Sequence, residues 1–350
     1  MKETARLRPL SLTRSAARQE FRARLLAWFD AHRRDLPWRR TRDAYAIWVS
    51  EIMLQQTRVA AVVERYGEFL RRFPTLAVLA GADEAEVLAA WSGLGYYRRA
   101  RMMLRAARVL ADAGASQMPG TAAELRTLPG IGSYTSAAIA SIAFGEAVAV
   151  VDGNVERVAM RLSGWSEESG AGLASAIAAQ AGSLLDHERP GDFNQAMMEL
   201  GATICLPRGP LCLRCPVFDY CLTRGEHLTA PRARMRSEEI AYALLQRGEG
   251  DEIEVLLEQR PASATVMTGM WELPLLNERA GAERIVLTLR HSIMRVNYTA
   301  AIAAFGEDEM PQPGPGAGDR RWFRLRQLAA LPLTGLARKA LRGTGLLGSG

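Results

Sequence analysis

The residues with the most explicit chemistry are four cysteines that all fall between positions 205 and 221. They follow the pattern Cys205-x6-Cys212-x2-Cys215-x5-Cys221. Because the chain shows no secretory signal, disulfides are improbable, and the clustering indicates a metal site built from four thiolates. Zinc and an iron–sulfur cluster both accept four cysteine ligands, so the spacing alone leaves both open.

A glutamate with unusual surroundings is the second chemical feature. Glu51 shares a helical stripe with the apolar residues Ile47 and Leu54. Such a side chain is either neutralised by an arginine or partly buried with a raised pKa. In the second case its carboxyl group keeps a proton at neutral pH and can donate it to a leaving group.

Asp152 offers a carboxylate of the opposite kind. It follows the strand-like run 147–151 and precedes a predicted helix, whose positive dipole end favours the ionised form. It is therefore either a helix cap or a functional anion. A protonated acid beside an ionised carboxylate is what cleavage of a glycosidic bond through an oxocarbenium-like transition state requires.

The segment Leu128-Pro129-Gly130-Ile131-Gly132 predicts a tight turn between two helices. Two glycines allow the turn to expose backbone N–H groups at a helix N-terminus, where a phosphate can bind. On its own, such a turn is more often a plain connector.

The elements that must position these residues change in type along the chain. Apolar residues recur at helical spacing from Phe21 to about Leu222, whereas a polar, Arg-rich joint occupies 228–236. Beyond it the pattern predicts strands and then helices, over 240–245, 253–257, 298–305, 325–331 and 336–341.

The charge of the chain is modest and local. It carries 44 Lys and Arg against 38 Asp and Glu, and its first forty residues hold 11 basic and 4 acidic side chains. Such an arm either meets phosphates or is a solvated tail. The start is Arg-rich and acid-poor like an organellar transit peptide, but it runs directly into a helical pattern. With no apolar run approaching roughly 18 to 20 residues, we expect an intracellular protein in a reducing compartment.

These motifs together resemble the endonuclease III and MutY superfamily of helix-hairpin-helix DNA glycosylases. The 6-2-5 cysteine spacing resembles the one that holds a [4Fe-4S] cluster in that superfamily, which makes Cys205, Cys212, Cys215 and Cys221 the expected ligands. The hairpin 128–132, followed by Val151-Asp152-Gly153-Asn154-Val155, resembles the hairpin and aspartate signature. The resemblance implies that Gly130 and Gly132 bind one DNA strand through its backbone.

Two features resemble the MutY-type adenine DNA glycosylases in particular. Glu51 stands in a Glu-x-x-Leu-Gln-Gln-Thr pattern, and Tyr134 occupies the place where endonuclease III-like enzymes carry a lysine nucleophile. The resemblance implies that Glu51 protonates adenine at N7 and later assists water. It also implies that Asp152 stabilises the sugar cation, that Asn154 orients the site, and that Tyr134 completes it.

Further segments resemble the substrate-binding parts of MutY-type enzymes. Those of the adenine pocket are Trp38, Arg39, Leu54 and Glu199. Gln56 and Tyr96, the latter in Gly93-Leu94-Gly95-Tyr96-Tyr97, resemble residues that insert into the duplex beside the lesion.

The C-terminal region resembles the Nudix-like domain that recognises 8-oxoguanine in MutY-type proteins. The similarity lies in 256–261 and 269–274, while nothing after Pro274 supplies the glutamate-rich metal helix of a pyrophosphohydrolase. Familiar members have Phe-Ser-His in the lesion-reading loop. Here 290–293 takes that place, with His291 and Ser292 as the expected reading residues.

The resemblance covers about 21–341 and implies a multidomain protein with an all-α helix-hairpin-helix glycosylase core, a [4Fe-4S] loop and a C-terminal α/β Nudix-like domain. We expect a flexible basic arm over 1–20, the glycosylase domain over 21–225, a linker over 226–236 and the Nudix-like domain over 237–345. The six-helix part is expected over about 43–149, and the iron–sulfur part over 21–42 plus 150–225.

The implied function is that of a monofunctional adenine DNA glycosylase in base excision repair, which acts on adenine opposite 8-oxoguanine or guanine in double-stranded DNA. A bifunctional endonuclease III-like glycosylase/lyase is disfavoured by the missing lysine. An inactive DNA mismatch sensor does not need both Glu51 and Asp152. We expect a cytoplasmic, nucleoid-associated bacterial monomer with no membrane partner.

The cofactor prediction has a direct spectroscopic test. If the four cysteines bind an iron–sulfur cluster, the purified protein should absorb near about 400 nm, as thiolate-bound clusters do, whereas a zinc site gives no such band. The spectrum should be recorded together with the iron and zinc content. Stoichiometric zinc without visible absorption would contradict the prediction.

Overall fold

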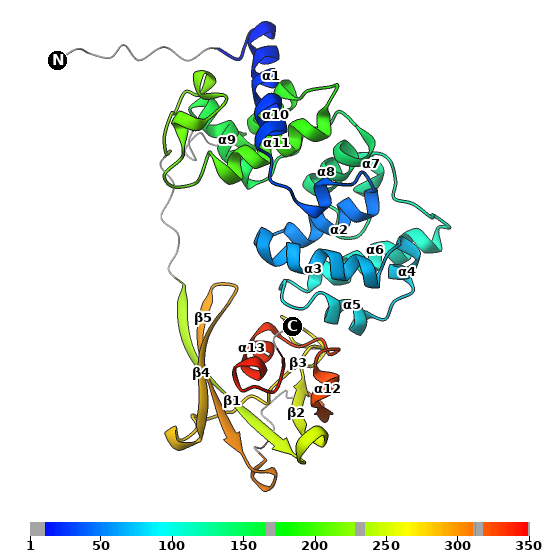
Figure 1. Ribbon diagram of the computed structural model, residues 1–350, viewed down its shortest axis with the longest axis vertical. Helices are drawn as coiled ribbons and strands as arrows, with labels where there is room; N and C mark the ends of the chain where they lie inside the picture. Colours follow the sequence, from blue (N-terminus) through cyan, green and yellow to red (C-terminus); the bar gives the residue numbers. More distant parts are fainter. Residues whose placement is uncertain (1–10, 166–171, 228–234, 311, 313–317, 349–350) are drawn as a thin grey trace, which may run out of the picture. The chain divides into compact units, whose positions relative to one another are not determined.

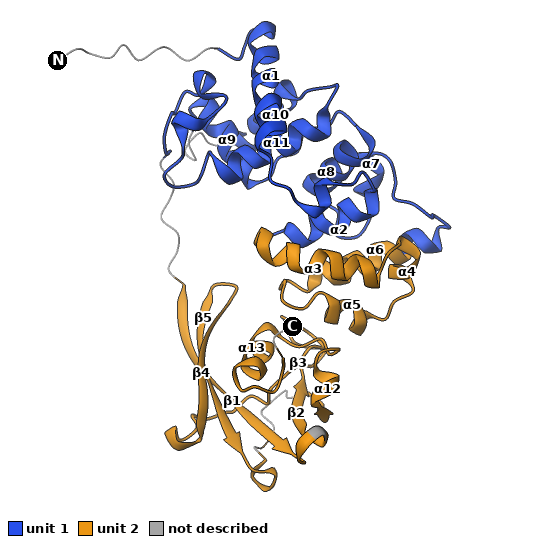
Figure 2. Cartoon of the chain, in the orientation of Figure 1, with its two compact units in different colours: residues 1–55, 109–231 blue, residues 56–108, 232–350 orange. Residues whose placement is uncertain are grey.

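The computed structural model describes residues 11–165, 172–227, 235–310, 312 and 318–348. The chain forms two compact units (Figure 2), and each unit joins stretches that are distant in the sequence. The first unit contains 1–55 and 109–231, and the second contains 56–108 and 232–350. The domain boundaries expected at 225 and 237 remain predictions, because most of the expected linker lies outside the described residues.

The first unit is helical (Figure 1). Its helices are α1 (Ser15–His32), α2 (Ala44–Leu54), α7 (Ala122–Leu125), α8 (Ser133–Phe144), α9 (Gly153–Ser163), α10 (Leu173–Leu184) and α11 (Pro190–Thr203). Short 3-10 turns complete it, namely η1 (Pro37–Arg39), η3 (Cys212–Arg214) and η4 (Phe218–Tyr220). The all-helical prediction for these stretches is confirmed.

Local sequence signals explain where the central helices begin and end. Asp43 caps α2 by accepting hydrogen bonds from the backbone N–H groups of Tyr45 and Ala46, and Asp152 caps α9 in the same way. Gly145 ends α8 and Gly164 ends α9, each in the left-handed conformation that glycine adopts without steric cost.

One apolar core holds α1, α9, α10 and α11 together. Phe21 and Phe29 of α1 are fully buried in it, beside Phe193 and Leu200 of α11. The half-buried Cys205, Cys215 and Cys221 pack against the same core. The helices therefore hold the base of the cysteine loop by ordinary apolar burial.

Two glycines allow α11 to approach its neighbours at backbone distance. A Cβ atom at Gly191 would lie 2.6 Å from the carbonyl oxygen of Ser141 in α8. A Cβ atom at Gly201 would lie 2.6 Å from the Cβ atom of Asn154 in α9. No side chain fits at either position, so α11 is held close to both helices that carry predicted site residues.

The second unit combines helices with a sheet. Its helices are α3 (Val59–Arg72), α4 (Leu76–Ala80), α5 (Glu84–Ala90), most of α6 (Arg98–Asp112), α12 (Leu325–Leu328) and α13 (Gly335–Gly343). Its strands are β1 (Arg236–Arg247), β2 (Glu254–Gln259), β3 (Trp271–Glu272), β4 (Ile285–Ile293), β5 (Val296–Phe305) and β6 (Arg320–Arg324).

The sheet is mixed, with strand order β3-β2-β1-β5-β4, and β6 pairs with β2. Strands β1 and β5 run parallel in register from Arg236↔Val296 to Leu245↔Phe305, while the other pairs are antiparallel. Alternate side chains of β1 point to opposite faces. Tyr242 and Leu244 join α12 and α13 in the main core of the unit.

The structure confirms the strands expected near 240–245, 253–257 and 298–305 and both expected helices. Other expectations were wrong. Residues 147–151 are not a strand, because no neighbouring strand pairs with them, and 290–293 belong to strand β4 rather than to a loop. Helix α1 begins at Ser15, so the end of the expected flexible arm is helical. None of the described helices has the length and apolarity needed to span a bilayer.

Because α9 and α11 approach closely at Gly201, even a substitution by alanine there should destabilise the fold. Gly201→Ala should lower the free energy of unfolding by about 1–3 kcal/mol, because the added methyl group must displace Asn154. Gly182→Ala in α10, where nothing lies within 4 Å of the added atom, is the matched control and should be neutral or slightly stabilising. Equal denaturant midpoints for the two variants would contradict this packing argument.

Candidate active site and cysteine loop

Glu51 lies in the last two turns of α2, a helix whose middle is buried on every side. Its side chain is only 5% exposed. The helix packs against α8, which brings Tyr134 from the first turn of α8 to the carboxyl group. The Tyr134 hydroxyl donates a hydrogen bond of 2.5 Å to Oε2 of Glu51, and the sulfur of Met198 in α11 lies 3.6 Å from the same hydroxyl.

Burial raises the pKa of Glu51 from 4.5 to about 7. The hydrogen bond from Tyr134 and the charge of Arg39 act in the opposite direction, whereas the negative charge of Asp152 adds to the rise. Burial, together with Glu51, also raises the pKa of Tyr134 well above its usual range. Tyr134 therefore remains a hydrogen-bond donor, and Glu51 exchanges its proton near neutral pH. The arginine-neutralised alternative for Glu51 is not what the structure shows.

Asp152 is held rigidly at the start of α9. Its Oδ1 accepts hydrogen bonds from the backbone N–H groups of Asn154 and Val155, at 2.9 and 2.7 Å, and its Oδ2 accepts one from Nδ2 of Asn154 at 2.8 Å. The helix-cap interpretation of Asp152 is thus correct for its geometry. The same bonds fix a carboxylate whose charge is felt at Glu51.

Asn154 is itself held in place by an arginine. Nη2 of Arg157 donates to Oδ1 of Asn154 at 2.9 Å and to the carbonyl oxygen of Gly201, while its Nε donates to the carbonyl oxygen of Cys205. Four predicted catalytic residues, Glu51, Tyr134, Asp152 and Asn154, thus form two hydrogen-bonded pairs that interact electrostatically.

The glycine turn has the geometry that the sequence indicates. Gly130 has φ of +77°, where a side chain would be strained, and Gly132 is the N-cap residue of α8 without a side-chain cap. Both glycines are exposed. The preceding α7 is fixed by a capping box between Thr121 and Glu124. The α8 N-terminus therefore presents backbone N–H groups to solvent, next to the helix turn that carries Tyr134.

Glu199 is the arginine-neutralised glutamate of this site. Burial alone would raise its pKa, but hydrogen bonds from Arg34 and Arg39, at 2.7 and 2.8 Å, outweigh that effect and hold it at about 2. Glu199 therefore stays ionised and ties the segment around η1 to α11. Trp38 is buried within η1, and Leu54, at the end of α2, is half-buried.

The remaining predicted substrate contacts belong to the second unit. Gln56 and Tyr96 are exposed and have φ values of +54° and +46°, which side-chain-bearing residues seldom adopt. His291 and Ser292 lie on β4, where Ser292 donates to Oδ1 of Asn297 on β5 at 2.6 Å. The half-buried His291 faces Gly335 of α13, and burial lowers its pKa.

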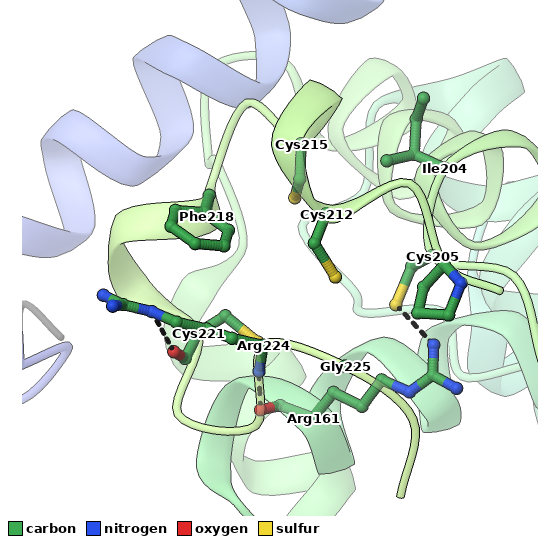
Figure 3. Close-up of a pocket in the computed structure, with 10 residues that line it drawn as sticks. Arg161, Ile204, Cys205, Cys212, Cys215, Phe218, Cys221, Arg224 and Gly225 are labelled. Carbon is green, nitrogen blue, oxygen red and sulfur yellow. Dashed lines mark hydrogen bonds between the residues drawn. The ribbon is translucent and has the colours of Figure 1, made fainter. Parts of the chain in front are cut away.

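The four cysteines line one pocket of the first unit (Figure 3). Arg161, which is buried in α9, also lines this pocket. Its Nη1 donates a hydrogen bond of 3.3 Å to the sulfur of Cys205 and one of 2.7 Å to the carbonyl oxygen of Leu206. The Cys221 thiol donates to the carbonyl oxygen of Arg161. The buried guanidinium of Arg161 therefore binds the first residues of the cysteine loop beside the pocket.

The arrangement of the sulfur atoms bears on what the pocket can hold. One zinc ion requires four thiolates at about 2.3 Å from a single centre. In the described part of the chain, no group of three or more His, Cys, Asp or Glu side chains is close enough to hold one ion. The four cysteines nevertheless line one pocket, and both a zinc ion and an iron–sulfur cluster can use four thiolates.

Four residues of the site were missed from the sequence. They are Arg34, Arg157, Met198 and Arg161. Arg161 carried a signal, because it lies among the apolar residues Val158 and Leu162 on the buried face of α9. Charged residues on an apolar stripe are usually paired when buried, and the same reasoning that selected Glu51 would have selected Arg161.

Comparison with known proteins defines the class of the helical part first. Residues 49–180 match the HhH-GPD superfamily of base excision DNA repair proteins. A solved structure of a thermostable thymine-DNA glycosylase superposes with a TM-score of 0.56 at 31% identity, over 60% of this chain and 97% of the other. Fold, hairpin and sequence thus define a helix-hairpin-helix base excision repair protein.

Two relatives narrow the class. The adenine DNA glycosylase of Mycolicibacterium smegmatis is 36% identical over 291 residues, which are 83% of this chain and 97% of the relative. The human adenine DNA glycosylase is 40% identical over 315 residues, 73% of this chain and 57% of the relative. The chain therefore belongs to the adenine DNA glycosylase family. It spans about half the length of the mammalian and plant relatives that it matches.

Because the pKa of Glu51 is raised, replacing Glu51 should increase the thermal midpoint by an amount that depends on pH. The folded protein keeps the Glu51 proton up to about pH 7, whereas the unfolded chain releases it near 4.5, so this stabilising contribution is lost as pH rises through that window. Glu51→Gln, which mimics the protonated acid, should raise the thermal midpoint at pH 8 by roughly 5–10 °C. The gain should shrink toward pH 5. A gain independent of pH would show that titration of Glu51 is not its cause.

Proposed function

We propose that this chain is a monofunctional adenine DNA glycosylase, which hydrolyses the N-glycosidic bond of adenine paired with 8-oxoguanine or guanine in duplex DNA and leaves an abasic site. Membership of the adenine DNA glycosylase family supports this assignment. The observation that carries it is the buried Glu51, bound to Tyr134 and with a pKa of about 7, beside the fixed carboxylate of Asp152.

The chemistry follows from the two carboxyl groups. Glu51 donates its proton to the adenine ring as the bond between C1′ and N9 breaks, which turns the base into a neutral leaving group. The sugar cation that remains is stabilised by the ionised Asp152, whose orientation Asn154 and the α9 N-terminus maintain. Water then adds to C1′ and loses a proton to the Glu51 carboxylate. Acid–base catalysis of this kind contributes about 10²–10⁴-fold in rate.

The absence of a nearby lysine favours hydrolysis without strand cleavage. The whole chain contains only Lys2 and Lys339. Lys339 lies on α13 of the second unit and donates to the carbonyl oxygen of Arg290, and Lys2 lies outside the described residues. A bifunctional glycosylase/lyase needs an amine to form a Schiff base with C1′. Tyr134 provides a hydroxyl bound to Glu51 instead.

We infer that Cys205, Cys212, Cys215 and Cys221 bind a [4Fe-4S] cluster. The pocket that all four cysteines line and their 6-2-5 spacing support this assignment. The cluster would fold the loop and carry no step of the base excision. Arg161 would act on the cluster through the sulfur of Cys205, because hydrogen bonds to sulfur ligands tune such clusters.

We propose that the other predicted site residues contact the DNA substrate. The exposed backbone at Gly130 and Gly132 would bind a phosphate of double-stranded DNA without reading its sequence. Trp38, Arg39, Leu54 and Glu199 would surround the extruded adenine. The C-terminal sheet with α12 and α13 would be a Nudix-like lesion-recognition domain that uses β4 at His291 and Ser292.

We further propose that the protein is a monomer and that it acts in the reducing compartment where bacterial DNA lies.

A single-turnover assay on a duplex with adenine opposite 8-oxoguanine tests the proposed function. The parent protein should produce alkali-labile abasic sites, and the strand should stay intact without alkali. Glu51→Gln should lower the rate by at least about 10²-fold and retain DNA binding, because it removes the proton donor but not the shape of the site. Strand cleavage without alkali would contradict the monofunctional assignment. Binding without any abasic product from the parent would indicate a mismatch sensor.

The pH dependence gives a further expectation from the same assay. Because Glu51 must be protonated, the single-turnover rate should fall as the pH rises above about 7. Tyr134→Phe removes a hydrogen bond that lowers the pKa of Glu51. The fall should therefore move to higher pH in that variant. A shift to lower pH would contradict the role assigned to the hydroxyl.

A further inference from the structure

Gln56 and Tyr96 are among the exposed residues of the second unit that have an uncommon backbone conformation. Gln56 precedes α3, and Tyr96 precedes α6. Their φ values are +54° and +46°, and Tyr96 is 52% exposed. This conformation costs free energy in any residue with a side chain, and it persists only where the surroundings enforce it. Residues held in this way cluster at sites that bind or act on ligands.

One side chain bonds to both of the segments that carry these residues. Nη2 of Arg99 in α6 donates to Oγ1 of Thr57, the residue after Gln56, at 2.9 Å. It also donates to the carbonyl oxygens of Leu94 and Gly95, immediately before Tyr96, at 3.1 Å each. The Thr57 hydroxyl donates to the carbonyl oxygen of Leu94 at 3.2 Å, so the two segments are bonded directly as well.

Ring contacts complete the same network. The guanidinium of Arg99 lies 5.5 Å from the ring centroid of Tyr96 and 5.4 Å from that of Trp91. Trp91 is fully buried and donates from Nε1 to the carbonyl oxygen of Gly95 at 3.1 Å. The exposed ring of Tyr96 is thereby connected through Arg99 to the buried core of the unit.

We propose that Arg99 is a positioning residue that holds Gln56 and Tyr96 in one fixed geometry for insertion into the duplex beside the extruded adenine. This inference rests on the proposed function. Extrusion of a base requires its stacking neighbours to be separated. Inserted side chains that are already ordered lose little further freedom when they enter the stack, whereas loose ones must be ordered at that moment. Arg99 does not contact the reacting atoms and acts through the two residues that it holds.

The test compares two substrates. Arg99→Met should lower the single-turnover rate on a fully paired duplex by about 10- to 100-fold. On a duplex whose pairs flanking the adenine are mismatched, so that the base is already unstacked, the variant should stay within about threefold of the parent. Arg105→Met, which removes an exposed arginine from the same helix, is the matched control and should leave both rates unchanged.

A second measurement separates positioning from a general loss of structure. With 2-aminopurine next to the target adenine, binding of the parent should increase the fluorescence as the neighbour unstacks, and Arg99→Met should give a smaller increase. Arg99→Lys, which keeps the charge but not the planar donor, should fall between the two. If Arg99→Met does not fold, Thr57→Val, which removes one acceptor of the network, should show the same substrate dependence in a weaker form.

The outcomes are distinguishable. Equal losses on both substrates, or an unchanged rate on the paired duplex, would overturn the positioning role. If the parent cuts neither substrate, the proposed function fails, and the fluorescence change on binding still decides whether Arg99 controls unstacking.

Discussion

The burial of one carboxyl group among apolar helices is the constraint on which the helical unit depends. Glu51 lies on α2, is nearly inaccessible to water, and accepts a hydrogen bond from Tyr134 of α8. Burial of an ionised carboxylate is expensive, so the group retains its proton to about neutral pH. The same packing that would be a defect in a structural core is useful where a proton must be delivered to a base.

Two other carboxyl groups of this unit, Glu199 and Asp152, lie in surroundings that differ from those of Glu51. Glu199 is as deeply buried as Glu51, but two guanidinium groups hold it ionised with a pKa near 2. Asp152 accepts hydrogen bonds from the backbone N–H of Asn154 and from the Asn154 side chain, which fix its orientation. Three carboxyl groups with the same intrinsic chemistry thus lie in three different surroundings. What distinguishes them is the donor that each one meets.

Glycine and arginine provide the mechanical support. Gly201 allows α11 to lie against Asn154, and Arg157 bonds Asn154 to the beginning of the cysteine loop. Arg161 holds that loop around its pocket. Arg99 performs the corresponding task in the second unit, where it joins two segments that carry exposed, strained residues. In a chain with two lysines, these tasks fall to the planar guanidinium, whose several donors can reach several acceptors at once.

The sequence by itself determined the features that arise within a few residues of one another. The cysteine spacing, the glycine turn, the cap at Asp152 and the position of Glu51 on an apolar stripe are all local, and the structure contains each of them. Tertiary structure alone decided the partners. Tyr134 lies 83 positions from Glu51, and Arg34 lies 165 positions from Glu199. Local sequence also did not reveal the parallel pairing of β1 with β5 or the placement of 290–293 in a strand. Local patterns specify which residues form a helix, a turn or a strand. The identity of the neighbour, and hence the pKa and the fixed orientation of each group, depends on how distant segments pack.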